Sequence, residues 1–231
     1  MRILILLAAF FISLPLALGA YKEGPFPNVT GGFGDQTCHA CHLDNPVNAP
    51  GGSLAVAGVP ATYIAGRAYA MTVTLSRDGM ERSGFEIAAR FASGKLRGTQ
   101  AGSWRLLDNR VQMIPSQVDP ALRFVQHNLA GSKPPAVGRN SWIVEWTAPS
   151  PPAGIVQFNV AGNATNNDDS PLGDFIYTKT VRSRPAASSR SPVRRQADRT
   201  RIAAVACSIE KFSATQEGAA PPHRLPSWRN P

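Results

Sequence analysis

The sequence predicts an all-β fold, an antiparallel sandwich of short strands, and three observations support this prediction. Segments between residues 53 and 181 alternate apolar and polar side chains with the two-residue period of a strand. Turns rich in Gly, Pro and Asn separate these segments, as is typical of sandwiches. After the first twenty residues, no apolar segment has the length and period of a convincing helix.

The expected strands follow one another along the chain at short intervals. The first runs from Tyr69 to Leu75, where Thr and Val suit a pleated, half-buried surface. The turn dipeptide Asp78-Gly79 leads into the second strand, Gly84 to Phe91. Trp142 and Trp146, four residues apart, lie on one face of a later strand and are expected in the core. The remaining strands, which bring the total to about eight, are 104–107, 111–114, 123–127, 142–146, 154–160 and 175–178.

The first twenty residues have the pattern of a secretory signal peptide. Met1-Arg2 is a short positive segment, residues 3–18 are almost continuously apolar, and Ala17-Leu18-Gly19-Ala20 supplies small residues for cleavage. The apolar run is shorter than the ~20 residues that span a bilayer, and no later segment is long enough to do so. We therefore expect an exported protein, periplasmic or secreted, with no membrane span once residues 1–20 are removed.

Residues 182–231 differ in composition from the rest of the chain. They hold 10 of the 24 Lys and Arg residues but 3 of the 15 Asp and Glu residues, so most of the net charge of +9 lies here. The segment is rich in Arg, Ser, Pro and Ala and is expected to be a basic, disordered, low-complexity tail. A shift of the reading frame near residue 182 is the alternative. Because the charge is confined to this segment, it does not indicate nucleic-acid binding, and Cys207 and His223 within it are poor ligand candidates.

Residues 21–52 are expected to form a loop that carries one chemical motif. Cys38-His39-Ala40-Cys41-His42 has the pattern C-x-x-C-H, the attachment sequence of c-type haem. Two thiols at this spacing can form thioethers with the two vinyl groups of one porphyrin, and the histidine that follows can bind the iron. Cys38 and Cys41 are therefore the expected covalent attachment points and His42 the expected proximal iron ligand, with haem c as the cofactor.

Three other uses of the two cysteines stay open. A Cys38–Cys41 disulfide is the simplest of them. A redox dithiol usually begins a helix in a βαβ pattern, which the flanking loop residues do not show. A zinc site needs four ligands, and the two cysteines with His39 and His42 are too crowded to supply them alone. Export and the histidine after the second cysteine favour haem, because a disulfide has no use for that histidine.

Short motifs in the middle of the chain point to a family. In order, they are Tyr63-Ile64-Ala65-Gly66-Arg67-Ala68-Tyr69, Gly84-Phe85-Glu86, His127 with Ala130-Gly131, Trp146-Thr147-Ala148-Pro149 and the segment from Gly154 to Val160. This order resembles the reeler domain, the amino-terminal domain type of reelin. It is still more similar to the bacterial branch of that type, called choice-of-anchor V, in which C-x-x-C-H precedes the sandwich. That branch ends on a pattern matched here by Ala161-Gly162-Asn163, Gly173-Asp174 and Ile176-Tyr177-Thr178.

The resemblance covers about residues 31–181 and carries implications for the fold. It implies an immunoglobulin-like β-sandwich, here residues 53–181, preceded by the haem-attachment loop. It implies little about activity, because one fold hosts many functions. The family usually continues into an anchoring segment, which residues 182–231 do not resemble.

The sixth iron position has one preferred candidate, His127, which ends an expected strand and matches the family's histidine. A hydrogen bond between its ring and neighbouring backbone is the alternative role. Met71 and Met113 are expected to be packed, whereas Met80, in a turn, is expected to be exposed enough to reach a haem. The polar residues between Asn163 and Asp174, which are Asn166, Asn167, Asp168 and Asp169, have side chains suited to calcium, but their spacing is that of an ordinary hairpin connection.

These features favour one function and leave a second open. The first is an exported one-haem c-type cytochrome for electron transfer or redox sensing, with a redox partner protein. The second is a non-catalytic extracellular adhesion or recognition module that meets a surface component and keeps a Cys38–Cys41 disulfide. An enzyme is not expected, because the sequence shows neither a Ser-His-Asp arrangement nor a distal acid–base pair near the haem motif.

Overall fold

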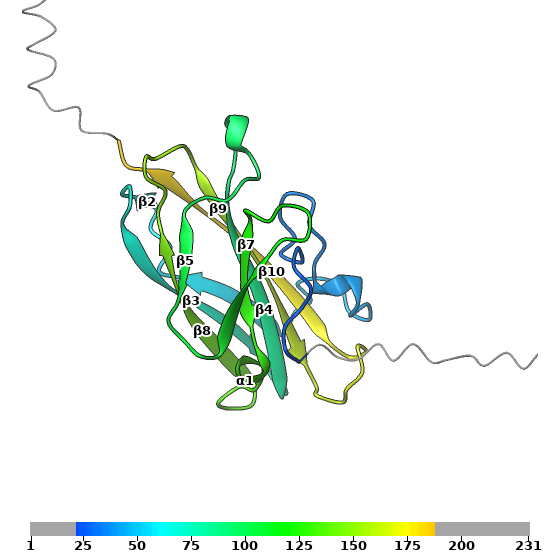
Figure 1. Cartoon of the computed structure of the whole chain (residues 1–231). Coiled ribbons are helices and arrows are strands. Elements are labelled where there is room, and N and C mark those ends of the chain that lie inside the picture. The colour runs from blue at the N-terminus through cyan, green and yellow to red at the C-terminus, as the bar shows by residue number, and fades with distance from the viewer. Residues whose placement is uncertain (1–21, 188–231) are drawn as a thin grey trace, which may run out of the picture. The chain divides into compact units, whose positions relative to one another are not determined.

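The computed structural model describes residues 22–187, which form two β-sheets (Figure 1). The expected signal peptide, residues 188–231 of the expected tail, Cys207 and His223 lie outside these residues. Within residues 22–187, no helix is long and apolar enough to cross a membrane. The predicted all-β sandwich is confirmed, because the sheets share one apolar core and the helices are single short turns.

The smaller sheet has four strands in the order β1-β3-β8-β5, and all neighbours are antiparallel. The larger sheet has six strands in the order β2-β10-β9-β4-β7-β6. Its neighbours are antiparallel except β2 and β10, which pair in parallel. The strands of the smaller sheet are β1 (Gly52–Ala57), β3 (Ala68–Arg77), β5 (Ser103–Leu106) and β8 (Arg139–Thr147). Those of the larger are β2 (Thr62–Tyr63), β4 (Arg82–Phe91), β6 (Val111–Pro115), β7 (Arg123–His127), β9 (Val156–Thr165) and β10 (Phe175–Pro185).

The structure departs from the expected elements in three places. Strands β1 and β2 were not anticipated, because one is rich in small residues and the other has two residues. Strand β10 continues to Pro185, past the predicted boundary at residue 181, because Arg184 and Pro185 pair with β2 and Ser183 is fully buried. Short helical turns also occur at η1 (Cys38–Ala40), η2 (Gly94–Leu96) and α1 (Leu129–Ser132).

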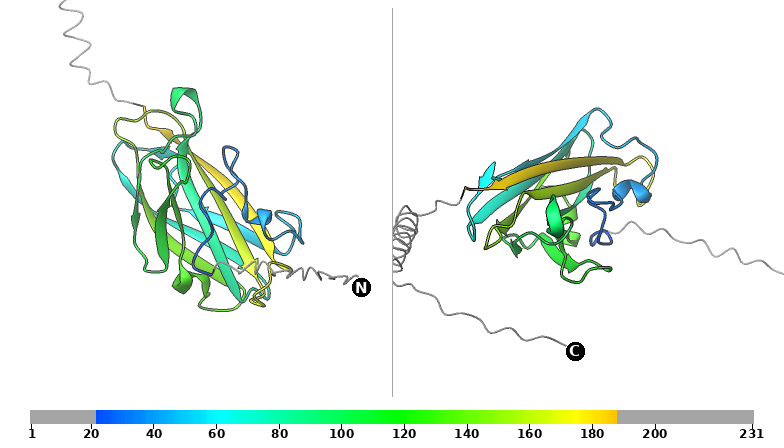
Figure 2. Two further views of the ribbon diagram at one scale, coloured as in Figure 1. Left: turned by 45° about the vertical axis from the view of Figure 1, so that its right-hand side comes forward. Right: turned by 90° about the horizontal axis from the view of Figure 1, so that it is seen from above.

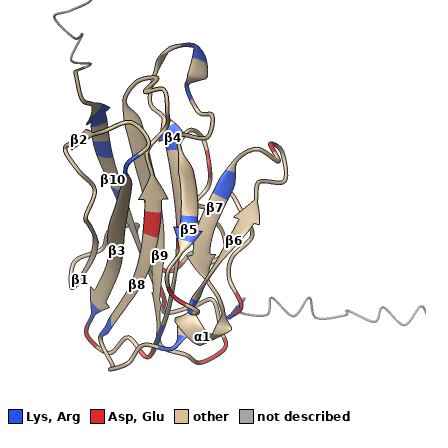
Figure 3. Cartoon of the chain, turned by 60° about the vertical axis from the view of Figure 1, so that its left-hand side comes forward, with Lys and Arg blue, Asp and Glu red and all other residues tan. Residues whose placement is uncertain are grey.

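The core between the sheets is apolar and rich in aromatic side chains. Trp142 and Trp146 of β8 are fully buried there, as predicted, and the two sheets meet where Trp146 packs edge-on against Phe158 of β9, 4.9 Å between ring centroids. Each indole N–H is satisfied by a carbonyl, Gly131 O at 2.9 Å for Trp142 and Ala101 O at 2.8 Å for Trp146. Charged residues are few along the strands of both sheets (Figure 3). In β8, the alternation that predicted the strand therefore also predicted which of its sides faces the core.

The central strands β4 and β9 of the six-stranded sheet are buried on both faces. In β4, Phe85 and Ile87 belong to the core, while the alternating Glu86 and Arg90 lie on the opposite, outer face and are also buried. Residues 22–51 cover that outer face, and Figure 2 shows this segment, in blue, against the strands. The loop that carries the C-x-x-C-H motif is thus packed on the sandwich as part of the fold.

Candidate functional site

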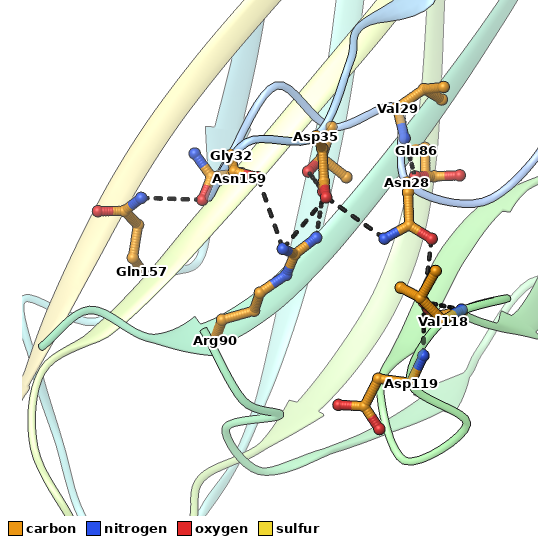
Figure 4. A network of polar contacts seen from close by, with 12 residues as sticks. Asn28, Val29, Gly32, Asp35, Glu86, Arg90, Val118, Asp119, Gln157 and Asn159 are labelled. Atoms are coloured by element: carbon orange, nitrogen blue, oxygen red, sulfur yellow. Dashed lines mark hydrogen bonds and ion pairs between the residues drawn. The ribbon is translucent and has the colours of Figure 1, made fainter. Parts of the chain in front are cut away.

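A buried ion pair fixes residues 22–51, called here the covering segment, to the six-stranded sheet. The guanidinium of Arg90 pairs with the carboxylate of Asp35, and both side chains are less than a tenth exposed (Figure 4). Arg90 also lies between the rings of Phe33 and Phe124, at 5.3 and 5.2 Å from their centroids. Asp35 accepts a further hydrogen bond from the Thr30 hydroxyl at 2.8 Å, so the carboxylate has several partners. The segment is anchored about three residues before the motif.

A second anchor involves Glu86, which lies four residues before Arg90 on the same face of β4. Its Oε1 accepts a hydrogen bond from the backbone N–H of Val29 at 2.9 Å. Burial raises the pKa of the Glu86 carboxyl to about 8, and the nearby negative charge of Asp35 adds to this, while the Val29 hydrogen bond and Arg90 oppose it. The group is therefore protonated over part of the neutral range.

The C-x-x-C-H motif forms one tight turn. The Thr37 hydroxyl caps it by accepting from the His39 N–H at 3.2 Å, and the N–H groups of Cys41 and His42 both donate to Cys38 O. Side chains three apart in a 3₁₀ turn line up on one side, so the turn brings the two thiols to the same side. Both are free thiols, Cys38 half-buried and Cys41 exposed. Burial raises the pKa of the Cys38 thiol to about 12, with a smaller contribution from Glu86.

His42 is held by two residues that are remote in sequence. Its Nε2 lies 3.1 Å from the amide Nδ2 of Asn163 in β9. Its Nδ1 lies 2.6 Å from Oδ2 of Asp174, the residue before β10, whose side chain is 1% exposed. The second contact is close but poorly aligned, because Nδ1 and the two carboxylate oxygens complete no well-formed hydrogen bond within the described part of the chain. His42 therefore sits in a polar socket built by the sheet.

A cavity of about 640 Å³ opens beside this socket. Its walls come from the covering segment, the start of β4, the end of β7 and the loop between β9 and β10. Cys38, Cys41, His42 and His127 all line it, whereas His39, which the motif excludes as a ligand, does not. The structure thus brings all four sequence-predicted site residues to one cavity.

His127 borders the cavity but is engaged with backbone. Its Nδ1 accepts the N–H of Phe85 at 3.1 Å and lies 3.3 Å from Phe85 O, so the ring takes the place of a strand partner beyond the last β4–β7 pair. Burial lowers the pKa of the imidazole to about 4, so the ring is neutral near pH 7. The backbone of Gly84 packs closely against the His127 ring. A Cβ atom at this position would come within 2.3 Å of His127 Cε1. The backbone-bonding role considered for His127 is observed.

Three methionines had been considered as iron ligands, and the burial of two of them differs from the prediction. Met71 is fully buried in the core, as predicted. The expectation for Met80 was wrong, because its side chain turns from the Asp78-Gly79 turn into the core and is 2% exposed. That for Met113 was also wrong, because β6 is an edge strand and Met113 faces outward, 41% exposed. None of these three, all within residues 22–187, lines the cavity.

The Asn- and Asp-rich loop between β9 and β10 bonds mainly to itself. Asn166 Nδ2 donates to Asp168 Oδ2 at 2.9 Å, and the Ser170 N–H donates to Asp168 Oδ1 at 2.9 Å. Asp169 pairs with Lys22 of the covering segment. Within residues 22–187, no group of three or more His, Cys, Asp or Glu side chains is arranged to hold a metal ion. The loop behaves as the hairpin connection that its spacing predicts.

Asn163 and Asp174 are the site residues whose part the sequence did not reveal. Both belong to motifs that carried the family resemblance and to the polar stretch considered for calcium, but nothing linked them to His42. Asn163 is 121 residues away from it along the chain. The one local signal is that Asn163 and Asn159 are polar residues alternating in an otherwise apolar strand, which would ordinarily indicate a solvent face.

No protein-family model and no curated protein matches the chain. Among solved structures, it is similar to the human F-spondin reeler domain, with 22% identity over 60% of this chain and 92% of that one and a TM-score of 0.37. It is also similar to AvmM, which catalyses macrocyclization in alchivemycin A biosynthesis (14% identity, 62% and 93% covered, TM-score 0.37). A third is a cohesin module of a Clostridium perfringens family 33 glycoside hydrolase (10%, 58% and 96%, 0.34). These three TM-scores are too low for the likenesses to indicate an activity or a partner.

Proposed function

We propose that the chain is an exported one-haem c-type cytochrome that transfers or senses single electrons. In this proposal Cys38 and Cys41 form the thioether bonds and His42 binds the iron. The observation that carries it is the common cavity, which is lined by both thiols and by His42. The bound haem would supply a one-electron couple.

The residues that line the cavity suit a covalently attached haem in their type and number. A cavity of about 640 Å³ is within the usual range for small-molecule and cofactor sites, ~300–1,000 Å³. The turn aligns the two thiols, as attachment to one porphyrin requires, and their i, i+3 spacing is that of the haem motif. Nδ1 of His42 lies 2.6 Å from Asp174 Oδ2, so the nitrogen left for a metal is Nε2, which faces the Asn163 amide at 3.1 Å.

His127 has a defined part in this proposal. It is the candidate for the sixth iron position, and it is neutral near pH 7 because burial lowers its pKa. In one tautomer its Nδ1 accepts from the Phe85 N–H; in the other Nδ1 donates to Phe85 O, which leaves Nε2 unprotonated. Coordination requires the second tautomer, whereas a purely structural histidine is satisfied by the first.

A second candidate function is a non-catalytic adhesion or recognition module. The observation in its favour is that both ring nitrogens of His42 already lie close to protein groups, Asn163 and Asp174. The histidine can then be explained as a fastener that ties the loop to β9 and β10, and Cys38 and Cys41 would form a disulfide. No cofactor is needed in this case.

The deciding experiment is a haem test on the exported full chain. The protein would be produced with and without a bacterial cytochrome c maturation system and examined by its reduced pyridine haemochrome spectrum and intact mass. We expect a covalent haem that is lost in the Cys38→Ala, Cys41→Ala variant and retained in Cys207→Ala. His42→Ala should lose the native ligand-field spectrum, with His39→Ala as the matched control, because His39 neighbours the same cysteines but does not line the cavity.

The alternative outcome is equally specific. A colourless protein two mass units lighter than its reduced form would show a Cys38–Cys41 disulfide and favour the recognition module. A haem that survives the loss of both cysteines would contradict the covalent attachment.

A further inference from the structure

The side chain of Asp174 is a deeply buried acidic group beside the motif. Its side chain is 1% exposed, and its Oδ2 lies 2.6 Å from His42 Nδ1. The position is fixed by the backbone, because Asp174 O accepts a hydrogen bond from Asn45 Nδ2 at 2.9 Å and β10 begins at the next residue. A carboxylate taken out of water is costly unless it is paired, and within residues 22–187 His42 is the one basic side chain within ion-pair distance of it.

The two neighbours of the His42 ring agree on where its proton lies. Oδ2 of Asp174 lies 2.6 Å from Nδ1 without completing a well-aligned hydrogen bond, and because a carboxylate oxygen accepts hydrogen bonds, its proximity favours a proton on Nδ1. The amide Nδ2 of Asn163 can only donate, and at 3.1 Å it favours an unprotonated Nε2. Both contacts select the Nδ1–H tautomer, whose free lone pair is on Nε2, the nitrogen that a metal would use.

We infer that Asp174 is a positioning residue that holds His42 in the orientation and tautomer needed to bind a metal through Nε2, with Asn163 occupying Nε2 until the cofactor binds. This inference rests on the proposed haem function. A histidine ligand whose other nitrogen donates to a carboxylate is more basic and more firmly oriented than one without this partner. A more basic ligand stabilises the ferric state, so Asp174 lowers the reduction potential of the site.

The test compares two substitutions that each replace one aspartate by asparagine. Asp174→Asn keeps the size of the side chain but weakens the acceptor at Nδ1. Asp78→Asn is the matched control, because Asp78 is exposed in the turn between β3 and β4 and does not line the cavity. Both would be made in the exported full chain, and haem content would be measured before the reduction potential.

We expect Asp174→Asn to keep its covalent haem and to raise the ferrous-to-ferric ratio at a fixed potential about tenfold, equivalent to ~59 mV for one electron. Asp78→Asn should leave the potential within error of the wild type, and Asp174→Glu should show a smaller shift than Asp174→Asn. Equal shifts in the two Asn variants would show a general charge effect and overturn the inference.

A second measurement needs no change at Asp174 and no haem. Long-range ¹H–¹⁵N NMR of the haem-free Cys38→Ala, Cys41→Ala chain reports which nitrogen of His42 carries the proton. The inference expects Nδ1–H, and an Nε2–H tautomer overturns it even if Asp174→Asn fails to fold. If the wild-type chain carries no haem, the proposed function fails and this inference with it. A haem-bearing chain with no Asp174-specific shift overturns the inference alone.

Discussion

The central strands of the six-stranded sheet, β4 and β9, are buried on both faces, but the two faces are built in opposite ways. The inner face packs Phe85, Ile87 and Phe158 against the tryptophans of the other sheet, and its stability comes from apolar area and ring contacts. The outer face carries Glu86, Arg90 and other polar side chains, and is closed by residues 22–51. The inner face is held by apolar contacts, which have little directional preference. The outer face is held by hydrogen bonds and ion pairs between particular residues.

The difference explains why the site lies where it does. An apolar core tolerates substitutions that keep volume, because dispersion contacts have little directional preference. A polar interface positions groups by hydrogen bonds and ion pairs, which have defined partners and angles. The covering segment is therefore held in one register on the sheet, and the C-x-x-C-H turn is placed over Asn163 and Asp174.

The largest expected effect is on the inner face. Trp142 is fully buried, its ring centroid lies 4.5 Å from that of Phe85, and its N–H bonds to Gly131 O. Replacing it by Ala should lower the free energy of unfolding by about 3–5 kcal/mol, because a large cavity is left behind. Urea unfolding followed by fluorescence of the remaining tryptophans measures this. A loss under about 1 kcal/mol would mean that the core is far more adaptable than its packing indicates.

The next effect tests the outer face through its buried ion pair. Arg90→Met leaves the Asp35 carboxylate buried without its cation and should cost about 3 kcal/mol. Hydrogen exchange should rise first in residues 28–42 and not in the core strands. The double variant Asp35→Leu, Arg90→Met removes both charges and should be more stable than Arg90→Met alone. If it is less stable, the hydrogen bonds of Asp35 with Thr30 and Asn28 outweigh the cost of burying its unpaired carboxylate.

A smaller effect is expected from pH. The carboxyl of Glu86 has a pKa raised by burial to about 8, above its ordinary value of 4.5. Between these values the folded chain binds a proton that the unfolded chain has lost, so this group makes stability fall as pH rises through that window, by at most ~1.4 kcal/mol per pH unit. The groups facing it are the charged side chains of Asp35 and Arg90 and the Cys38 thiol, which is uncharged in this window because burial raises its pKa to about 12.

Glu86→Gln keeps an oxygen for the Val29 N–H and removes the titration. Its free energy of unfolding, measured from pH 5 to pH 8, should depend less on pH than that of the wild type. Stability should also fall towards acid pH, because burial lowers the pKa of His127 from 6.5 to about 4 and the unfolded chain therefore binds a proton that the folded chain does not. This loss should be the same in the wild type and in Glu86→Gln. Identical pH profiles would show that Glu86 is ionised throughout.

The smallest effect belongs to an ion pair of the same chemistry on the solvent side of the other sheet. Arg105 and Glu145 form two hydrogen bonds of 2.7 Å between β5 and β8, but the Arg105 side chain is 65% exposed. Water screens such a pair, so Arg105→Ala should leave the urea midpoint unchanged within error. A loss comparable with that of Arg90→Met would remove the distinction between the buried and exposed pairs.

The sequence predicts the inner face well and the outer face poorly. Period-two alternation marked the strands that hold Trp142 and Trp146, because apolar side chains that alternate must share a face. The same alternation assigns Glu86, Arg90 and Asn163 to solvent, since charged and amide side chains are mostly exposed. Their burial depends on residues 22–51 folding back over the sheet, which no local pattern shows. The spacing of Cys38, Cys41 and His42 revealed the motif, but its partners Asn163 and Asp174 required the fold.

The distance in sequence between His42 and Asn163, 121 residues, also has a consequence in time. Chains are synthesised from the amino end at ~5–20 residues per second, so the C-x-x-C-H turn exists for roughly 6–24 s before its socket has been made. During that interval neither β9 nor β10 covers the thiols or the imidazole. Any enzyme that modifies the two cysteines thus meets an open peptide early and a partly covered turn late.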